Sequence, residues 1–164
     1  MNNIYNKFTF KILTIAIIFF LDRISKIYIL DFFENNQIQE IAIFNFLNFY
    51  LIWNEGIAFG LLNFDSEKFY NIVTIIIILI SLIVLFYALK IKNYSGYFFS
   101  LIFGGALGNL YDRIYFSAVP DFIDLHIGNY HWFIFNVADI FISVGIICLI
   151  FDELFFNKTN NEEV

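Results

Sequence analysis

The chain has 164 residues, of which 60% are hydrophobic and 15% are charged, with a net charge of −6 and a mean hydropathy of +0.75. Soluble domains are about 45–50% apolar, so this composition excludes an ordinary soluble enzyme and indicates a single integral membrane domain over residues 1–164. Nine Lys and Arg residues without a cluster argue against nucleic acid as a partner. The single cysteine, Cys148, excludes a disulfide within the chain.

Four apolar segments are long enough to cross a bilayer, which takes about 20 residues. In chain order, the predicted spans cover about 8–30, 69–89, 96–111 and 132–151. The expected fold class is therefore an all-α membrane protein with four transmembrane helices.

Basic residues predict how these spans are oriented. Lysines lie before the first span, between the second and third, and after the fourth. Lys and Arg are enriched in cytoplasmic loops, so both termini are expected in the cytoplasm. The two longer loops, 31–68 and 112–131, are then expected on the outer side.

The first of these outer loops has a composition typical of β-structure. Residues 38–53 are rich in β-branched and aromatic side chains, and they are too few and too polar to form a fifth span. This pattern predicts one or two short strands on the membrane surface, or an irregular amphipathic loop. Aromatic residues such as Trp53 and Trp132 mark the expected outer interface.

Two polar groups interrupt the first half of the chain. Asp22 and Lys26 are four residues apart, so they share a helix face and can form an ion pair, either as simple neutralisation or as support beneath a site. Asn54 and Gly56 lie in a kink within aromatic sequence. Gly56 is compatible with a plain turn, whereas the Asn54 amide can both donate to and accept from a peptide backbone.

The end of the third predicted span combines small and polar residues. Gly104 and Gly108 form a GxxxG pair, a pattern that lets helices approach closely. Asn109, Asp112 and Arg113 follow. Asp112 and Arg113 are interpreted either as a surface ion pair or as part of a polar cluster near the membrane.

Asp121 and Asp139 are the most informative residues, because each carboxylate lies in a short polar patch within strongly apolar sequence. A charge near hydrocarbon costs roughly 2.5–3.5 kcal/mol on insertion scales, so such groups usually have a function. Asn136 precedes Asp139 by three residues and is expected on the same helix face. Two adjacent carboxylates can share a proton and activate water.

Other catalytic chemistries have weaker support. His126 and His131 are five residues apart without a ligand motif such as HExxH, so no metal site is expected. No serine lies in a GxSxG motif, which argues against a serine hydrolase of that kind. A carboxylate pair needs no cofactor, and none is expected.

Five polar motifs in this order resemble the bacterial lipoprotein signal peptidases, the signal peptidase II family. The matching groups are Asp22-x-x-Ser25-Lys26, Asn54-x-Gly56-x-Ala58-Phe59, Gly104-Gly105-Ala106-x-Gly108-Asn109-x-x-Asp112-Arg113, Val119-x-Asp121-Phe122 and Phe135-Asn136-x-Ala138-Asp139. Each motif alone is weak, but together they extend from the first span to the fourth. Ile57 and Ile140 depart from the commoner family pattern without removing a required functional group.

The resemblance implies a monomeric aspartic endopeptidase in the bacterial cytoplasmic (inner) membrane, with its active site toward the outer face. Such an enzyme cleaves prolipoproteins before a diacylglyceryl-modified cysteine, so its partners are these precursors and membrane lipid. Asp121 and Asp139 map onto the catalytic pair. The substrate-binding or supporting positions are Asn54, Gly56, Asn109, Asp112, Arg113, Asn136, Asp22 and Lys26.

A function from another class stays open on the residues themselves. A small ion-coupled membrane carrier could use Asp139 and Asp22 as proton sites. The lack of an internal repeat and the gathering of charges on the outer side argue against a carrier.

Overall fold

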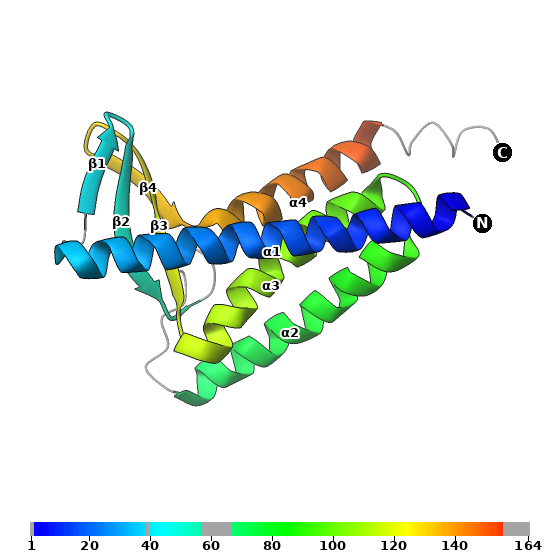
Figure 1. The fold of residues 1–164 in the computed structure, drawn as a ribbon, viewed down its shortest axis with the longest axis horizontal. Helices are drawn as coiled ribbons and strands as arrows, with labels where there is room; N and C mark the ends of the chain where they lie inside the picture. The colour runs from blue at the N-terminus through cyan, green and yellow to red at the C-terminus, as the bar shows by residue number, and fades with distance from the viewer. Residues whose placement is uncertain (1, 39, 57–66, 156–164) are drawn as a thin grey trace.

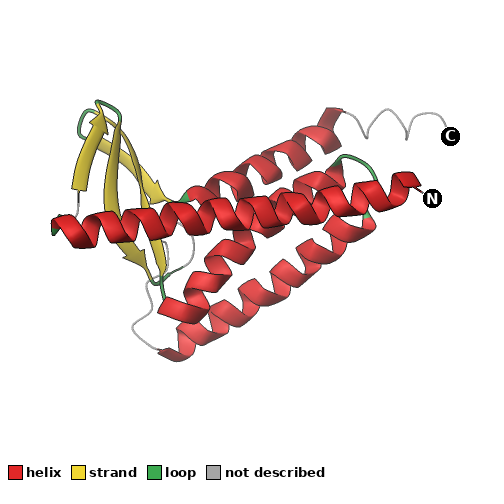
Figure 2. Ribbon diagram, viewed as in Figure 1, coloured by secondary structure: helices red, strands yellow, loops and turns green. Residues whose placement is uncertain are grey.

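A bundle of helices with a small antiparallel sheet at one end forms the molecule (Figures 1 and 2). The structure is a computed structural model that describes residues 2–38, 40–56 and 67–155. The helices are α1 (Asn2–Asn36), α2 (Glu67–Lys90), α3 (Ser95–Phe116) and α4 (Val137–Phe155). The mostly helical fold with a small β-rich segment is confirmed. Part of the predicted loop 31–68, including motif residues 57–59, lies outside the described residues.

The number of membrane spans remains a prediction. Among the described residues, one segment, Tyr70–Lys90 of α2, combines the length, hydropathy and low charge of a membrane span. The first helix carries Asp22, Arg23 and Lys26 within its apolar sequence. Figure 1 shows the start of α1 and the end of α4 at the end of the bundle opposite the sheet.

Helix α3 is the central element of the bundle, because it contacts α1, α2 and α4. A Cβ atom at Gly104 would lie 2.9 Å from Cβ of Ile18 on α1, and one at Gly105 would collide with the carbonyl oxygen of Ala138 on α4. Gly108 lies directly against the carboxylate of Asp22. The expected packing role of the Gly104–Gly108 pair is confirmed, and it brings the polar residues of three helices together.

The four strands form a sheet in the order β1-β2-β3-β4, with every pair antiparallel. Their bounds are β1 (Glu40–Phe44), β2 (Leu47–Asn54), β3 (Val119–Ile127) and β4 (Tyr130–Phe135). The prediction of strands in 38–53 is thus confirmed. The pairing of β2 with β3 joins two outer segments far apart in sequence, and places Asn54 opposite Val119.

Near the sheet, the structure differs from the predicted end of the third helix, the predicted loop after it and the predicted start of the fourth helix. The third helix continues to Phe116, and residues 119–127, expected as loop, form β3. The fourth helix begins at Val137 rather than near Trp132, because Tyr130–Phe135 pairs with β3 across a turn at Gly128, whose φ is +60°. An apolar strand cannot be told from an apolar helix start by composition alone.

The first helix also extends further than expected, to Asn36 instead of residue 30. Its last turns carry Ile29 and Phe33, which are both 4% exposed and pack with Phe122 of β3 in one apolar cluster. Burial of large apolar side chains stabilises such a contact by about 1.5–3 kcal/mol each. The added length of α1 therefore anchors the sheet to the bundle.

Candidate active site

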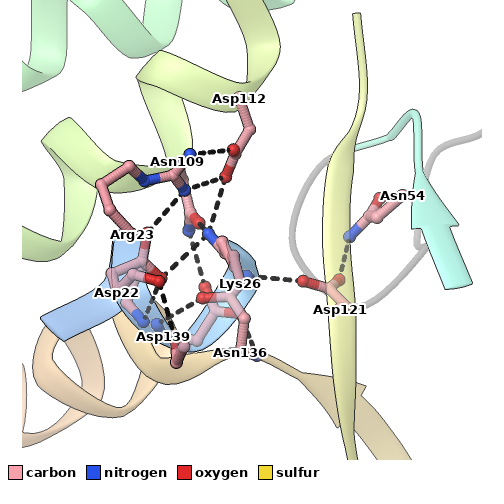
Figure 3. A network of polar contacts seen from close by, with 11 residues as sticks. Asp22, Arg23, Lys26, Asn54, Asn109, Asp112, Asp121, Asn136 and Asp139 are labelled. Carbon is pink, nitrogen blue, oxygen red and sulfur yellow. Dashed lines mark hydrogen bonds and ion pairs between the residues drawn. The ribbon is translucent and has the colours of Figure 1, made fainter. Parts of the chain in front are cut away.

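Asp121 and Asp139 line the same cavity, which has a volume of about 320 Å³. Asp121 comes from β3 and Asp139 from α4, so the cavity lies where the sheet meets the bundle (Figure 3). Its lining residues are Asn54, Ile77, Ala106, Asn109, Arg113, Val119, Asp121, Asn136, Asp139, Ile142, Ser143 and Ile146. The two predicted catalytic carboxylates and four of the predicted supporting residues therefore share one site.

Asp121 is almost fully buried, with 2% of its surface exposed. Both of its carboxylate oxygens accept hydrogen bonds from amides. Asn54 Nδ2 donates to Oδ2 over 2.9 Å, and Asn136 Nδ2 donates to Oδ1 over 2.6 Å. Figure 3 shows Asp121 on its strand between Asn54 and the residues of the helices. These bonds fix the orientation of the carboxylate.

Asp139 lies in the first turn of α4. Asn136 precedes the helix and caps it, since the Asp139 N–H donates to Asn136 Oδ1 (3.2 Å) and the Asn136 N–H donates to Asp139 Oδ2 (3.1 Å). This reciprocal pair is a capping box. Asn109 Nδ2 donates to the other oxygen, Oδ1, over 2.9 Å.

Asn136 consequently connects the two carboxylates: its side chain binds Asp121 and its backbone N–H binds Asp139. The donors to both acids are neutral amides, so no cation hydrogen-bonds to either one among the described residues. Burial, and next the negative charge of Asp139, raise the pKa of Asp121 to about 7 against the hydrogen bonds from Asn54 and Asn136. A carboxyl group with that pKa can hold a proton near neutral pH.

The raised pKa of Asp121 gives the protein a defined pH dependence. The ordinary value is 3.8 and the folded value about 7, so folding favours the protonated form. The stability that Asp121 contributes is fully present below the ordinary pKa of 3.8, and it is lost as pH rises through the pKa of about 7 in the folded protein. An asparagine at this position cannot ionise, so Asp121→Asn should lose less stability than the parent protein as pH rises between these two pKa values. Thermal unfolding in detergent from about pH 4 to pH 8 measures this, and equal pH slopes for both proteins would contradict it.

A buried cluster of four charges lies beside the carboxylates (Figure 3). Arg23 Nη2 donates to Asp22 Oδ2 (2.7 Å) and Asp112 Oδ2 (2.6 Å), and Lys26 Nζ lies 3.0 Å from Asp22 and 2.7 Å from Asp112. The carboxylates of Asp22 and Asp112 are fully buried. Of the two interpretations of Asp112 and Arg113, the surface ion pair is wrong, because Asp112 is buried and pairs with Arg23 and Lys26 of α1. Asp112 instead belongs to a polar cluster, the other interpretation.

This charge cluster is connected to the capped start of α4. Lys26 donates to Asn109 Oδ1 over 2.9 Å, while Asn109 in turn donates to Asp139. The N–H of Ala138 donates to Asp22 Oδ1 over 3.0 Å. Asp22 and Lys26 therefore contact the residues around Asp139 through intermediates, and their supporting role stays a prediction.

Arg113 points toward the cavity and not toward Asp112. Its Nη2 donates to the carbonyl oxygen of Gly56 over 2.7 Å, and the N–H of Gly56 donates to Asn54 Oδ1 over 3.0 Å. The turn after β2 is thus fixed by side chains on both sides. Buried Nη1 of Arg113 has no hydrogen-bond partner within residues 2–38, 40–56 and 67–155.

Comparison with known proteins decides the family. The family model described as signal peptidase (SPase) II matches residues 14–155. This chain belongs to the signal peptidase II family. Family membership confirms the resemblance carried by the five motifs, and assigns the chain to membrane peptidases that act on lipoprotein signal peptides.

Similar proteins extend over the whole chain. The lipoprotein signal peptidase of Pelagibacter ubique is 52% identical, covering 99% of both chains, and that of Aquifex aeolicus is 44% identical, covering 96% of this chain and 93% of its own. A bacterial membrane enzyme solved by the in meso method at 2.3 Å is 30% identical, with a TM-score of 0.73, covering 95% of this chain and 93% of the other.

One polar residue of this signal peptidase II site was missed from the sequence. Arg23 binds both Asp22 and Asp112, and its guanidinium also lies 4.7 Å from the ring centre of Tyr111. The signal was present: two acids and one lysine in the cluster leave one negative charge, so a further buried cation was required. Asp22, Arg23 and Lys26 lie close together in one apolar segment. The sequence alone therefore does not show which of the two cations pairs with an acid.

Proposed function

We propose that this chain removes signal peptides from prolipoproteins as an aspartic endopeptidase, with Asp121 and Asp139 as its catalytic pair. The observation that supports this most is the link through Asn136, which holds the buried carboxylate of Asp121 and the half-buried carboxylate of Asp139 at one cavity with neutral partners. Two carboxyl groups in such surroundings can share one proton, as in other aspartic proteases.

The chemistry follows from two carboxyl groups in different protonation states. The ionised carboxylate accepts a proton from water, whose oxygen attacks the scissile carbonyl carbon. The protonated carboxyl group donates its hydrogen to the carbonyl oxygen, which gives a tetrahedral gem-diol. The C–N bond then breaks as the acid that took the water proton gives it to the leaving amine, and the other acid takes a proton back from a gem-diol hydroxyl, so the pair returns to its starting state. The two acids titrate as a unit, so the roles of general acid and general base belong to the pair and not to one named residue.

The surrounding residues fit positioning roles in this reaction. Asn54 and Asn136 orient Asp121, and Asn109 orients Asp139. Buried Nη1 of Arg113, which lacks a partner within the described ranges, is available to donate to a carbonyl of the bound peptide. Cleavage of a lipid-modified precursor by the purified protein in detergent tests the proposal, and lack of any cleavage would refute it.

The carrier alternative receives no support from the ion pairs of Asp22. That carboxylate contacts both Arg23 and Lys26. Repeated proton uptake and release would require these contacts to break. The same residues are better suited to holding the start of α4 through Ala138.

A second cavity, of about 370 Å³, supports lipid recognition beside the catalytic pair. Asp139 and Ser143 line both cavities. The other lining residues are mostly apolar: Leu125, Trp132, Phe133, Phe135, Ile140 and Val144. We propose that the diacylglyceryl group of the substrate lies near this surface and sets the depth and orientation of the scissile bond.

Removal of the lipid should therefore reduce cleavage strongly. A membrane-dissolved substrate has already left water, so its lipid contributes mainly by placing the peptide at the carboxylates. A non-lipidated precursor in the same micelles is expected to show a fall in kcat/KM of at least about tenfold, because misplacement of a substrate can cost about 10²-fold. Equal cleavage of both precursors would instead favour recognition of the peptide alone.

The proposed location is the bacterial inner membrane, with four spans, both termini in the cytoplasm and the site toward the outer face. The start of α1 and the end of α4 lie at the end of the bundle opposite the sheet, which supports this orientation (Figure 1).

Cysteine labelling tests the orientation. With Cys148 replaced by Ser, a single cysteine at Asn36 or Asn129 should react with an impermeant thiol reagent from the outer side, whereas one at Asn93 should not. Asn36 and Asn129 belong to the sheet end, and Asn93 follows α2 at the other end. The opposite labelling pattern would overturn the orientation.

A further inference from the structure

Three potential metal ligands meet on the β3–β4 hairpin. His126 of β3 is paired in register with His131 of β4, and Asp124 lies two residues before His126. Nδ1 of His131 lies 2.8 Å from Asp124 Oδ2, and Nδ1 of His126 lies 3.9 Å from the same oxygen. One ligand atom from each residue lies within 4.8 Å of the other two.

Two buried polar atoms in this group lack a partner. Asp124 is 3% exposed, yet its Oδ1 accepts no hydrogen bond from the described part of the chain. Nδ1 of His126 is likewise buried and unpaired among those residues. A buried polar group without a partner costs about 1–3 kcal/mol. A bound cation would satisfy a carboxylate oxygen and an imidazole nitrogen together.

We propose that Asp124, His126 and His131 bind a divalent transition-metal ion of the zinc class. Zinc takes imidazole nitrogen and carboxylate oxygen at about 2.0–2.2 Å, and three protein ligands leave a fourth position for water. Imidazole nitrogen favours such an ion over Ca²⁺ or Mg²⁺, which prefer oxygen ligands.

The spacing of the ligands fits with small side-chain adjustments. Two ligands of one tetrahedral zinc are roughly 3.4 Å apart, from the bond lengths above. The observed separations of 2.8 and 3.9 Å lie on either side of this value. The side chain of His131 is 54% exposed, so its ring has room to move.

The metal would have a structural effect distinct from the peptidase chemistry. None of the three ligands lines the cavity of Asp121 and Asp139. An ion bound by residues of β3 and β4 would cross-link the two strands next to the turn at Gly128. Since Asp121 is on β3, the ion would stiffen the strand that carries one catalytic carboxylate. The sequence did not predict a site, because the sheet alone brings these residues together.

Cobalt provides a direct test, because Co²⁺ in a tetrahedral site absorbs visible light more strongly than hydrated Co²⁺. The full chain is purified without a metal-binding tag and titrated with Co²⁺ in detergent micelles, then with Zn²⁺. We expect a visible absorption that saturates at one ion per chain and disappears on Zn²⁺ addition. The chain has two histidines in all, so imidazole ligation can come only from His126 and His131.

Variants decide whether these residues are the ligands. Metal binding should weaken at least about tenfold in each of three variants: His131→Ala, Asp124→Asn and the double variant His126→Asn/His131→Asn. Tenfold is the lower end of the loss in metal affinity seen when a group that only hydrogen-bonds to a metal ligand is removed. Exposed Asp31→Asn is the matched carboxylate control and should bind as the parent does. Circular dichroism checks that each variant is folded; His131→Ala changes a half-exposed side chain and keeps the test open if the others misfold.

Two results would overturn the proposal. One is the lack of a saturable cobalt spectrum in the parent protein, and the other is unchanged binding in folded His131→Ala. A rise in the parent's unfolding temperature with Zn²⁺, lost in His131→Ala, would further support cross-linking of the hairpin. Precursor cleavage is measured separately, so failure here leaves the peptidase proposal unaffected.

Discussion

Asp121→Asn and Asp139→Asn are each expected to reduce precursor cleavage by at least about 10²–10⁴-fold, the usual contribution of a general acid or base. An amide cannot take up the proton of water or exchange one with its neighbour. Both acids are contacted by amide donors, and each replacement keeps a side-chain oxygen to accept one such bond. The variants should therefore fold while losing turnover, which a cleavage assay and circular dichroism measure together.

The double variant sharpens this prediction. Residues that act as a unit lose function together, so Asp121→Asn/Asp139→Asn should be little slower than either single variant. Asp31→Asn, which changes an exposed carboxylate on α1, is the matched control and should retain normal cleavage. Near-normal turnover in either single variant would show that the catalytic pair is assigned incorrectly.

Lys26→Met is expected to destabilise the protein by about 3–5 kcal/mol, the cost of breaking a buried ion pair by removing one partner. Lys26 is 1% exposed and contacts two buried carboxylates, Asp22 and Asp112. Its removal leaves both carboxylates with Arg23 alone. Unfolding by denaturant in micelles measures the loss. Cleavage should also fall, because Lys26 orients Asn109, which binds Asp139.

A charge-balanced double variant separates electrostatics from packing. Lys26→Met/Asp22→Asn leaves one cation, Arg23, with one anion, Asp112, and the new amide oxygen can still accept from the Ala138 N–H. This protein should be more stable than Lys26→Met alone. Lys92→Met, which removes an exposed lysine, is the matched control and should be close to neutral. A double variant as unstable as the sum of the two single changes would contradict the charge-balance explanation.

The structure connects the prediction for Asp121 and Asp139 with the prediction for Lys26. The charge cluster holds the start of α4 through Asp22 and the Ala138 N–H, and Asp139 follows immediately. Gly105 allows α3 to reach the backbone at Ala138. Stability of the cluster and alignment of the proposed catalytic pair therefore depend on the same close contact of α1, α3 and α4.

Much of the candidate site could be predicted from sequence, because charge in apolar sequence is costly and therefore conspicuous. Asp121, Asp139 and their asparagine neighbours stand out on this ground alone. The GxxxG spacing likewise predicted close helix packing, and both glycines of the pair, Gly104 and Gly108, lie against α1. The order of the motifs further indicated the family, which the family model confirms.

Pairing between residues distant in sequence was decided only by the tertiary structure. Which cation neutralises Asp112 depends on the crossing of α1 and α3, and that crossing placed Arg23 and Lys26 there instead of Arg113. Whether residues 130–135 extend a helix or form a strand depends on β3 as a partner, because apolar residues suit both. The sequence determined which groups need compensation, and the packing of helices and strands determined which groups provide it.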